Sequence, residues 1–338
     1  MEKNDVESVK KLISTPKNII IVAHKNPDGD AIGSSLGLYH YLNIMGHKAT
    51  VIVPNDYPEF LKWMPGTETI VNYEASKDTS DILINSADII FTLDFNLLSR
   101  SGSMASALEN SEAIKIMIDH HQQPDTYAKY TYSDTAMSST SEMIYHFINK
   151  MGDISLVTKE MATCLYAGIV TDTGSFRFAS TTAQTHEVVA DLIKKGAKND
   201  YIHNSIFDNN SYHRMQLLGC ALNNMKVLPE LKTAYITLSQ AELNKYNFVK
   251  GDTEGFVNYG LSVKGIVFAA IFIENLQENI VKISFRSKGD FSVNEFARKY
   301  FNGGGHNNAA GGRSDLPLKE TTEKFESLLP KYKDELNK

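Results

Sequence analysis

Histidine and aspartate residues recur directly after apolar runs in the first half of this 338-residue sequence. Three runs are followed in this way: the first by His24, Asp28 and Asp30, another by Asp94, and a third by Asp119, His120 and His121. Asp172 occurs further along, in GIVTDTGSFRF. This mixture of imidazoles and carboxylates suits Mn²⁺, with Mg²⁺, Co²⁺ or Zn²⁺ less favoured. The residues therefore predict a metal site, provided that the fold brings them together.

Apolar runs without polar alternation predict strands that are buried on both faces, as in a parallel sheet. Such runs occupy residues 18–23, 49–53, 87–93 and 113–118. Residues 31–45 have apolar side chains at helical spacing, and Gly46 stands where that helix would end. The opening is therefore β-α-β, which predicts a doubly wound, mainly parallel α/β domain. Its carboxyl edge is where open α/β sheets place their sites, and the histidines and aspartates would lie there.

The predicted cluster has the composition of a two-metal hydrolytic site. Two ions about 3.5–4 Å apart can activate a water molecule and stabilise the attacking and leaving oxygens at phosphorus. Hydrolysis of a phosphate ester is therefore the hypothesis.

Each segment also has a purely structural interpretation. Taken alone, His24 could simply end a strand, Asp28 or Asp30 could be the N-cap of the following helix, and Asp94 could be a turn residue. A purely structural role is harder to assign to Asp119-His120-His121. Three adjacent ionisable residues after a buried strand carry a desolvation cost unless they are paired or bind a metal.

Other site types that share parts of this pattern are excluded by individual residues. In an EF-hand loop starting at Asp28, Ile32 would stand at the fifth position and Tyr39 at the twelfth, where a glutamate is required. The glycines at 29, 33 and 37 are four residues apart and do not form G-x-G-x-x-G, and no P-loop motif occurs. We expect these glycines to allow a tight strand-to-helix turn and close helix packing.

The remainder of the chain predicts more helices and then a second α/β segment. Helices are expected at 138–151, at 158–170 and over a long region from 182 to about 225, broken near Gly196 and at 208–210. Strand-like runs follow at 233–238, 265–273 and 279–285, with one helix near 293–300. We therefore predict a catalytic domain over 1–190, a helical connector over 191–228 and a smaller α/β substrate-binding domain over 229–338.

A glycine-rich segment, NGGGHNNAAGG, is a candidate for binding substrate. Consecutive glycines such as Gly304 and Gly305 let backbone N–H groups converge on an anion without obstruction by Cβ. His306, together with Arg286 in SFRSK, could add side-chain donors. A flexible turn is the alternative interpretation of the glycines alone.

Composition narrows the classes of function. The chain is 42% hydrophobic and 22% charged, which is ordinary for a folded protein of about two domains. A net charge of −6 argues against binding of long duplex DNA or of an anionic membrane through a basic face. Cys164 and Cys220 are far apart and fit core packing in a reducing compartment. With no signal peptide or membrane span in the sequence, we expect a cytoplasmic location.

The ordered motifs resemble those of the DHH phosphoesterase family. The resemblance is carried by His24-x-x-x-Asp28-Gly-Asp30, Leu93-Asp94, Asp119-His120-His121 and Thr171-Asp172-Thr173, and by residues 284–312, which resemble the DHH-associated substrate-binding domain. It spans nearly the whole chain. One departure is that Asn307 and Asn308 stand where relatives often carry a basic residue.

The resemblance implies a role for each candidate residue. One Mn²⁺ would be bound by His24, Asp28 and Asp94, and a second by Asp30, Asp94, His120 and Asp172, with Mg²⁺ or Co²⁺ as substitutes. Asp119 would orient an imidazole, and His121 would face the scissile phosphate. The terminal phosphate or nucleotide of the substrate would be held by Arg286, Gly304, Gly305 and His306. Ser138-Ser139-Thr140 and Arg100 also resemble family positions, without an assigned role.

The resemblance also implies a substrate class. Two-domain members of the family hydrolyse short oligoribonucleotides (nanoRNA) and dephosphorylate pAp, and they tend to form homodimers. Other hypotheses within the same chemistry are a phosphodiesterase for cyclic or linear dinucleotides such as c-di-AMP and pApA, and an exopolyphosphatase. A long single-strand exonuclease is less favoured, because no additional nucleic-acid-binding module or basic groove is evident. A non-catalytic nucleotide-binding protein is the hypothesis from another class.

Overall fold

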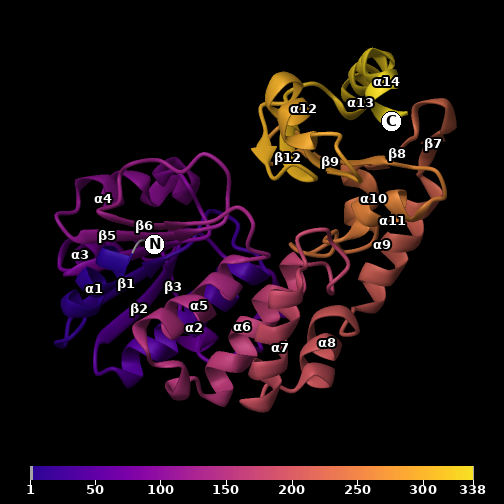
Figure 1. Cartoon of the computed structure of the whole chain (residues 1–338). Helices are drawn as coiled ribbons and strands as arrows, with labels where there is room; N and C mark the ends of the chain where they lie inside the picture. The colour runs from indigo at the N-terminus through magenta and orange to yellow at the C-terminus, as the bar shows by residue number, and fades with distance from the viewer. Residues whose placement is uncertain (1–2, 338) are drawn as a thin grey trace. The chain divides into compact units, whose positions relative to one another are not determined.

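The chain forms two compact units in the computed structural model, which describes residues 3–337 (Figure 1). The first unit is Met1–Asn209 and the second is Asn210–Lys338. The division falls just before helix α9 (Tyr212–Asn223), where the sequence has a break between two helical segments. None of the helices within residues 3–337 is long and apolar enough to cross a membrane.

The first unit is built on a six-stranded parallel sheet in the order β3-β2-β1-β4-β5-β6. Its strands are β1 (Asn18–Val22), β2 (Lys48–Val53), β3 (Val71–Asn72), β4 (Ile89–Leu93), β5 (Ile114–Asp119) and β6 (Tyr130–Ser133). The doubly wound fold class is therefore confirmed. The strand order reverses between β1 and β4, and in open α/β sheets the crevice beyond such a reversal is the usual ligand site.

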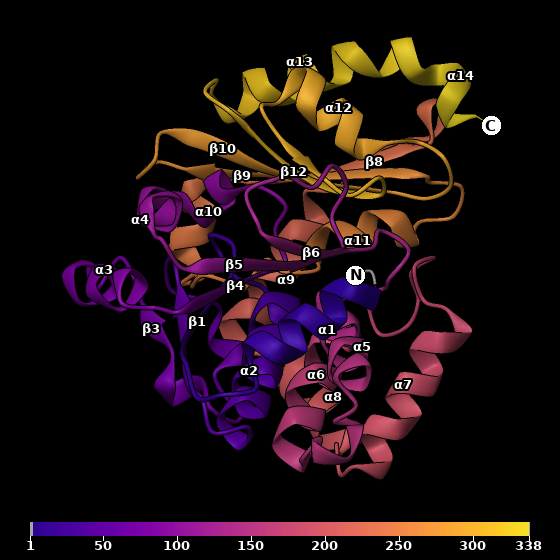
Figure 2. The same ribbon diagram turned by 60° about the vertical axis from the view of Figure 1, so that its left-hand side comes forward.

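Helices cover both faces of this sheet (Figures 1 and 2). The core of one face includes side chains of α1 (Lys3–Leu12), α2 (Gly29–Ile44), α5 (Thr140–Met151), α6 (Lys159–Asp172), α7 (Ala183–Lys194) and α8 (Asn199–Phe207). The core of the other face includes side chains of α3 (Lys77–Asn85) and α4 (Ala105–Asn110). Short 3-10 helices are η1 (Glu59–Leu61), η2 (Thr67–Thr69), η3 (Leu98–Met104) and η4 (Ile154–Leu156).

Helices α2 and α6 pack unusually closely. A Cβ added to Gly33 would lie 2.6 Å from the Cys164 carbonyl oxygen and 2.9 Å from the Gly168 nitrogen, both backbone atoms of α6. Such separations are shorter than van der Waals contact, so the two backbones can approach this closely only with glycine at position 33. This crossing brings the first turn of α2 and the last turn of α6, which carry Asp30 and Asp172, toward the same end of the helix pair.

The second unit contains a mixed six-stranded sheet in the order β11-β12-β10-β9-β8-β7. Its strands are β7 (Lys226–Leu228), β8 (Thr233–Leu238), β9 (Phe268–Asn275), β10 (Ile280–Ser287), β11 (Gly304–Gly305) and β12 (Ala309–Ser314). One face carries α9, α10 (Gln240–Lys245) and α11 (Phe256–Ser262), and the other carries α12 (Val293–Tyr300), α13 (Leu318–Leu328) and α14 (Lys333–Leu336). Two 3-10 helices, η5 (Pro229–Leu231) and η6 (Leu329–Tyr332), complete it.

The glycine-rich segment forms an antiparallel hairpin at the edge of this second sheet. Gly304 pairs with Gly311, and Gly305 pairs with Ala310. A Cβ on Gly303 would meet backbone atoms of the opposite strand, including Gly312 Cα at 2.8 Å. The glycines therefore permit close approach of two backbones within a sheet. The alternative interpretation from the sequence, a flexible turn, does not describe this segment.

Candidate active site

The structure brings the six predicted metal-binding residues of the first unit together at the carboxyl edge of the parallel sheet. His24 follows β1, Asp94 follows β4 and His120 follows β5, while Asp28 and Asp30 lie at the start of α2 and Asp172 ends α6. The site therefore lies where the strand order reverses. Within these six residues, two groups of three have ligand atoms within 4.8 Å of one another: His24, Asp28 and Asp94, and Asp30, His120 and Asp172.

Asp94, a member of the first group, also faces the second group. Its Oδ2 is 3.5 Å from His24 Nε2, and its Oδ1 is 3.5 Å from His120 Nε2. The carboxylate is buried, with 2% of the residue exposed. Its backbone has φ +64°, a left-handed conformation that costs a non-glycine residue about 1–2 kcal/mol. This conformation occurs directly at the strand end and is typical of functional positions.

The first group is formed where β1 leads into α2. His24 Nε2 lies 3.8 Å from Asp28 Oδ2, while Nδ1 lies 2.9 Å from the Lys25 carbonyl oxygen. The other oxygen of Asp28, Oδ1, accepts hydrogen bonds from the amides of Asp30 and Ala31, both at 3.1 Å. Asp28 is therefore the N-cap of α2 and a candidate ligand at the same time, so the two interpretations of this residue are compatible.

The second group gathers around His120. Its Nε2 lies 3.5 Å from Asp172 Oδ2 and 3.9 Å from Asp30 Oδ2, and its Nδ1 lies 3.2 Å from the Met137 carbonyl oxygen. With Nδ1 donating to that carbonyl, Nε2 is the atom directed at the carboxylates, which is the usual arrangement for a ligand histidine. Asp172 is the more exposed carboxylate, with 27% of its side chain accessible, whereas Asp30 is 1% exposed.

His121 is held by a fully buried partner. Its Nδ1 lies 2.7 Å from Asp119 Oδ1 and 3.6 Å from Asp94 Oδ1. Asp119 has no exposed surface, and its Oδ2 makes no hydrogen bond with the residues that the structure describes. A buried carboxylate at this distance fixes both the orientation of the imidazole and the position of its proton.

The cluster contains more negative charge than the imidazoles can balance. Burial raises the pKa of Asp30, and the neighbouring carboxylates of Asp94 and Asp172 raise it further, well above 3.8. Burial also opposes ionisation of Asp94, but the imidazoles of His120 and His24 outweigh it and hold this pKa well below its usual value. Added positive charge would relieve this crowding, so the donor set fits divalent cations in chemistry as well as in position.

Backbone groups that sequence reasoning did not identify complete the site. The amides of Thr140 and Ser141, in the first turn of α5, donate to the two oxygens of Asp30 at 2.6 and 2.8 Å. The Thr140 hydroxyl donates to Asp94 Oδ1 at 3.0 Å. The Ser138-Ser139-Thr140 segment was a signal for this contact, whereas no side-chain pattern points to the Met137 carbonyl or the Ser141 amide.

The candidate substrate residues of the second unit meet near one end of its sheet. Arg286 of β10 pairs with Ala309 of β12, and the amide of His306 donates to the Ala309 carbonyl at 2.7 Å. The amide of Gly305 donates to Asn294 Oδ1 at 3.0 Å, and Gly304 lies in the adjacent β11 strand. Arg286 and His306 are therefore neighbours of the same residue.

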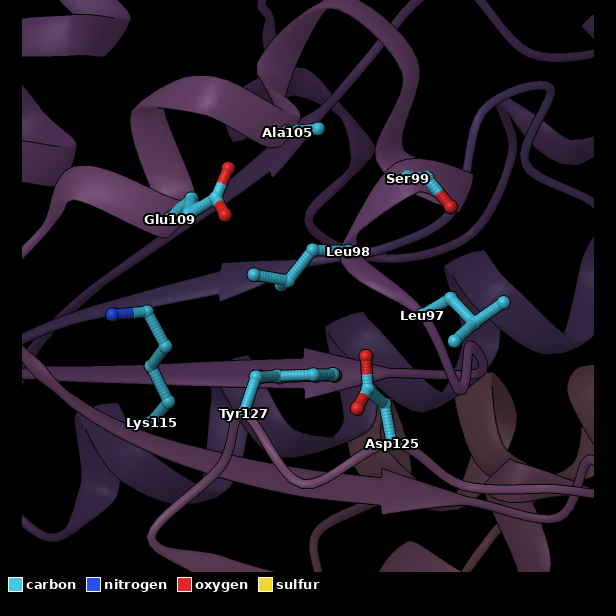
Figure 3. Close-up of a pocket in the computed structure, with 8 residues that line it drawn as sticks. All are labelled: Leu97, Leu98, Ser99, Ala105, Glu109, Lys115, Asp125 and Tyr127. Carbon is cyan, nitrogen blue, oxygen red and sulfur yellow. The ribbon is translucent and has the colours of Figure 1, made fainter.

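A separate hollow of about 380 Å³ lies beside the segments that follow β4 and β5 (Figure 3). Its lining comprises Leu97, Leu98, Ser99, Ala105, Glu109, Lys115, Asp125 and Tyr127. The Lys115 ammonium donates to the Ser111 carbonyl at 2.6 Å, and the Tyr127 hydroxyl lies 2.8 Å from Thr92 Oγ1. None of the six candidate metal ligands lines this hollow.

The doubly wound sheet and its donor cluster are together typical of hydrolases that act on phosphate esters. Residues 18–169 match the DHH family N-terminal domain, and residues 232–338 match the DHHA1 domain. The chain belongs to the DHH family of phosphoesterases.

Several relatives are similar in sequence to this chain over nearly its whole length. A protein of Thermus thermophilus named bifunctional oligoribonuclease and PAP phosphatase NrnA is 32% identical over 334 residues, which cover 98% of this chain and 94% of the relative. The Bacillus subtilis protein of the same name is 31% identical over 304 residues, covering 89% and 90%. Among solved structures, an exopolyphosphatase-related protein from Bacteroides fragilis is 41% identical in sequence. Its crystal structure superposes with a TM-score of 0.95 over 100% of this chain and 98% of that protein.

Proposed function

We propose that this protein is a divalent-cation-dependent phosphoesterase that hydrolyses short oligoribonucleotides and removes a phosphate from pAp. The observation that carries the proposal is Asp94, whose two carboxylate oxygens face His24 and His120 at 3.5 Å each. A carboxylate in this position can be shared between two ions. The proposed catalytic domain is residues 1–190, followed by a helical connector (191–228) and the substrate-binding domain (229–338).

The proposed ligands of one ion are His24, Asp28 and Asp94, and those of the other are Asp30, Asp94, His120 and Asp172. Mn²⁺ is the favoured metal because imidazole and carboxylate ligands occur together, with Mg²⁺ or Co²⁺ as substitutes. When held by these residues, two such cations would supply activation of a water molecule and balance of the negative charge on the phosphoryl oxygens. The backbone amides that bind Asp30 keep its carboxylate oriented toward this site.

His121 and Asp119 are the proposed catalytic pair. Asp119 accepts the Nδ1–H of His121 at 2.7 Å, and this leaves Nε2 as the nitrogen that can contact the substrate. With the ring oriented in this way, Nε2 is the nitrogen proposed to exchange a proton with the leaving oxygen of the substrate.

The substrate class is supported by the two relatives named oligoribonuclease and PAP phosphatase. Arg286, Gly304, Gly305 and His306 are proposed to hold the terminal phosphate or nucleotide of the substrate, because Arg286 and His306 flank the same residue of β12. Polyphosphate is a second candidate substrate, favoured by the name of the Bacteroides fragilis structure.

A substrate panel tests the proposal. The purified chain is incubated with Mn²⁺ and with pApA, pAp, c-di-AMP or polyphosphate, and product release is compared for the parent, Asp94→Asn and a control, Asp78→Asn, which changes an exposed aspartate of α3. Bound metal is measured in parallel by calorimetric titration with Mn²⁺.

We expect the parent and Asp78→Asn to hydrolyse pApA and pAp, and Asp94→Asn to lose activity and Mn²⁺ affinity together. Undiminished activity in Asp94→Asn would contradict the shared-carboxylate mechanism. Fastest turnover of polyphosphate or c-di-AMP would reassign the substrate. No hydrolysis of any of the four would favour a non-catalytic nucleotide-binding protein.

A further inference from the structure

Three consecutive residues with left-handed backbone follow the last helical turn of α6. Gly174, Ser175 and Phe176 have φ values of +56°, +61° and +63°. Glycine adopts this region freely, but a bulky residue such as phenylalanine is a conformational outlier there. Outliers of this kind persist only when the surrounding structure determines them, and they are concentrated at functional sites.

Packing of the Phe176 side chain maintains this turn. Its ring centroid lies 5.4 Å from that of His186, 6.1 Å from that of Tyr166 and 6.4 Å from that of His203. The Phe176 amide donates to Thr173 Oγ1 at 3.1 Å. Phe176 is thus anchored among the side chains of α6, α7 and α8, and the chain must pass through the left-handed turn to place it there.

The same turn presents the next two residues at the surface, beside the candidate metal site. The amides of Arg177 and Phe178 donate to the carbonyl of Thr173 at 3.0 and 3.1 Å, and Thr173 directly follows Asp172. Both residues are exposed. The backbones of both residues are therefore held next to the residue that follows a proposed metal ligand, and their side chains are accessible.

Each of these side chains is positioned by Gly174. Arg177 Nε donates to the Gly174 carbonyl at 2.7 Å, which orients the guanidinium. The ring of Phe178 lies against Gly174, where a Cβ would be 2.6 Å from Cε1 and 2.8 Å from Cε2. Although the ring is supported in this way, Phe178 is 38% exposed. Pre-positioned side chains lose little conformational freedom when a ligand binds.

We infer that Arg177 and Phe178 form a nucleoside-binding platform: the ring of Phe178 stacks on the base next to the hydrolysed phosphate, and the Arg177 guanidinium contacts a phosphate oxygen. Exposed aromatic rings beside cationic groups are how proteins bind single-stranded nucleotides without reading their sequence. The inference rests on the proposed hydrolysis of oligoribonucleotides. It adds a reason for preferring nucleotides to polyphosphate, which has no base to stack.

The experiment compares pApA with an analogue in which the bases are replaced by hydrogen. Steady-state kinetics with Mn²⁺ are measured for the parent, Phe178→Ala, Phe178→Trp, Arg177→Gln and Tyr201→Ala. Tyr201 serves as the matched control because it is an exposed aromatic residue of the same unit, 51% accessible, and packs on Trp63 instead. Binding of a methylene-bridged, non-hydrolysable pApA is measured in the same variants, and thermal unfolding verifies that they fold.

For Phe178→Ala we expect kcat/KM with pApA to fall about 5- to 100-fold, mainly through KM, with little change for the base-free analogue. Phe178→Trp should retain the parent value, and Arg177→Gln should lose about tenfold with both substrates. If Phe178→Ala loses the same factor in kcat/KM with both substrates, or loses none with either, the inferred nucleoside-binding platform is wrong. The proposed function would still stand. A parent that neither hydrolyses nor binds these compounds refutes both.

Discussion

Replacing Gly168 with alanine tests how closely α6 packs against the residues that hold Asp30. A Cβ at this position would lie 2.8 Å from Ser141 Cβ and 3.0 Å from Asp30 Oδ1, and it would overlap the Ser141 hydroxyl. Rotating the hydroxyl away does not relieve the contact with Ser141 Cβ. Because the Ser141 amide donates to Asp30 Oδ1 at 2.8 Å, moving Ser141 also moves the carboxylate.

Two opposing effects set the magnitude of this perturbation. Alanine is favoured over glycine within a helix by about 1 kcal/mol. Overpacking a well-filled core costs about 1–3 kcal/mol, and here the added methyl group meets a Cβ atom and a carboxylate together. With the overpacking cost in the upper part of this range, about 2–3 kcal/mol, we expect Gly168→Ala to lower the free energy of unfolding by about 1–2 kcal/mol. Misorientation of a ligand carboxylate should also weaken Mn²⁺ binding by about 10- to 100-fold.

The assay is denaturant unfolding followed by tryptophan fluorescence and by circular dichroism. The single tryptophan, Trp63, lies in the first unit and reports its unfolding. The control is Gly219→Ala in α9 of the second unit, where nothing lies within 4 Å of the added Cβ. Circular dichroism should show the stability of this unit rising by up to about 1 kcal/mol, and Trp63 fluorescence should show the first unit unchanged. If Gly168→Ala is as stable as the parent and keeps its phosphodiesterase activity and Mn²⁺ affinity, the packing argument is wrong.

Three further predictions follow from the site and its support. Asp119→Asn should lower kcat about 10- to 100-fold without unfolding the protein, because His121 loses its charged partner; unchanged kcat would contradict this. Burial raises the pKa of Glu142, but the nearby His146 imidazole and the hydrogen bonds from Ser138 and Thr185 outweigh it and lower this pKa below 4.5. The stabilisation that ionised Glu142 provides is therefore present above pH 4.5 and is lost as pH falls through the lowered pKa. Urea titrations should show Glu142→Gln less stable than the parent at pH 7, with a smaller difference at pH 4. Mn²⁺ at 100 times its Kd should raise the free energy of unfolding of the first unit by about 2.7 kcal/mol, measured by Trp63 fluorescence, and EDTA should reverse the effect.

The buried parts of the parallel sheet were predictable because burial on both faces leaves a nearly continuous apolar run. β1, β2, β4 and β5 have this character. The edge strands β3 and β6 are short and only partly buried, so they have no such run and were missed. Strand β8 and helix α12 coincide with the predicted ranges 233–238 and 293–300, where the apolar pattern and the flanking residues agree.

The placement of five of the six candidate ligands follows from strand order, because side chains after parallel strands collect at one edge of a sheet. Asp172 could not be placed in this way, since it reaches the site from the end of a helix that crosses α2. The amides of Thr140 and Ser141 and the Met137 carbonyl are backbone groups, which every residue possesses. Only their position distinguishes them, so a sequence pattern cannot single them out.

Asp28 uses its two carboxylate oxygens for different purposes, one to cap α2 and one toward His24. The effect of Asp28→Ala on activity would therefore overstate the role of Asp28 as a ligand. This substitution removes the helix cap, worth about 1 kcal/mol, together with the candidate ligand. Asparagine is as good an N-cap as aspartate but has no negative charge to offer a cation. Comparing Asp28→Asn with Asp28→Ala thus separates the contribution of this residue to folding from its contribution to catalysis.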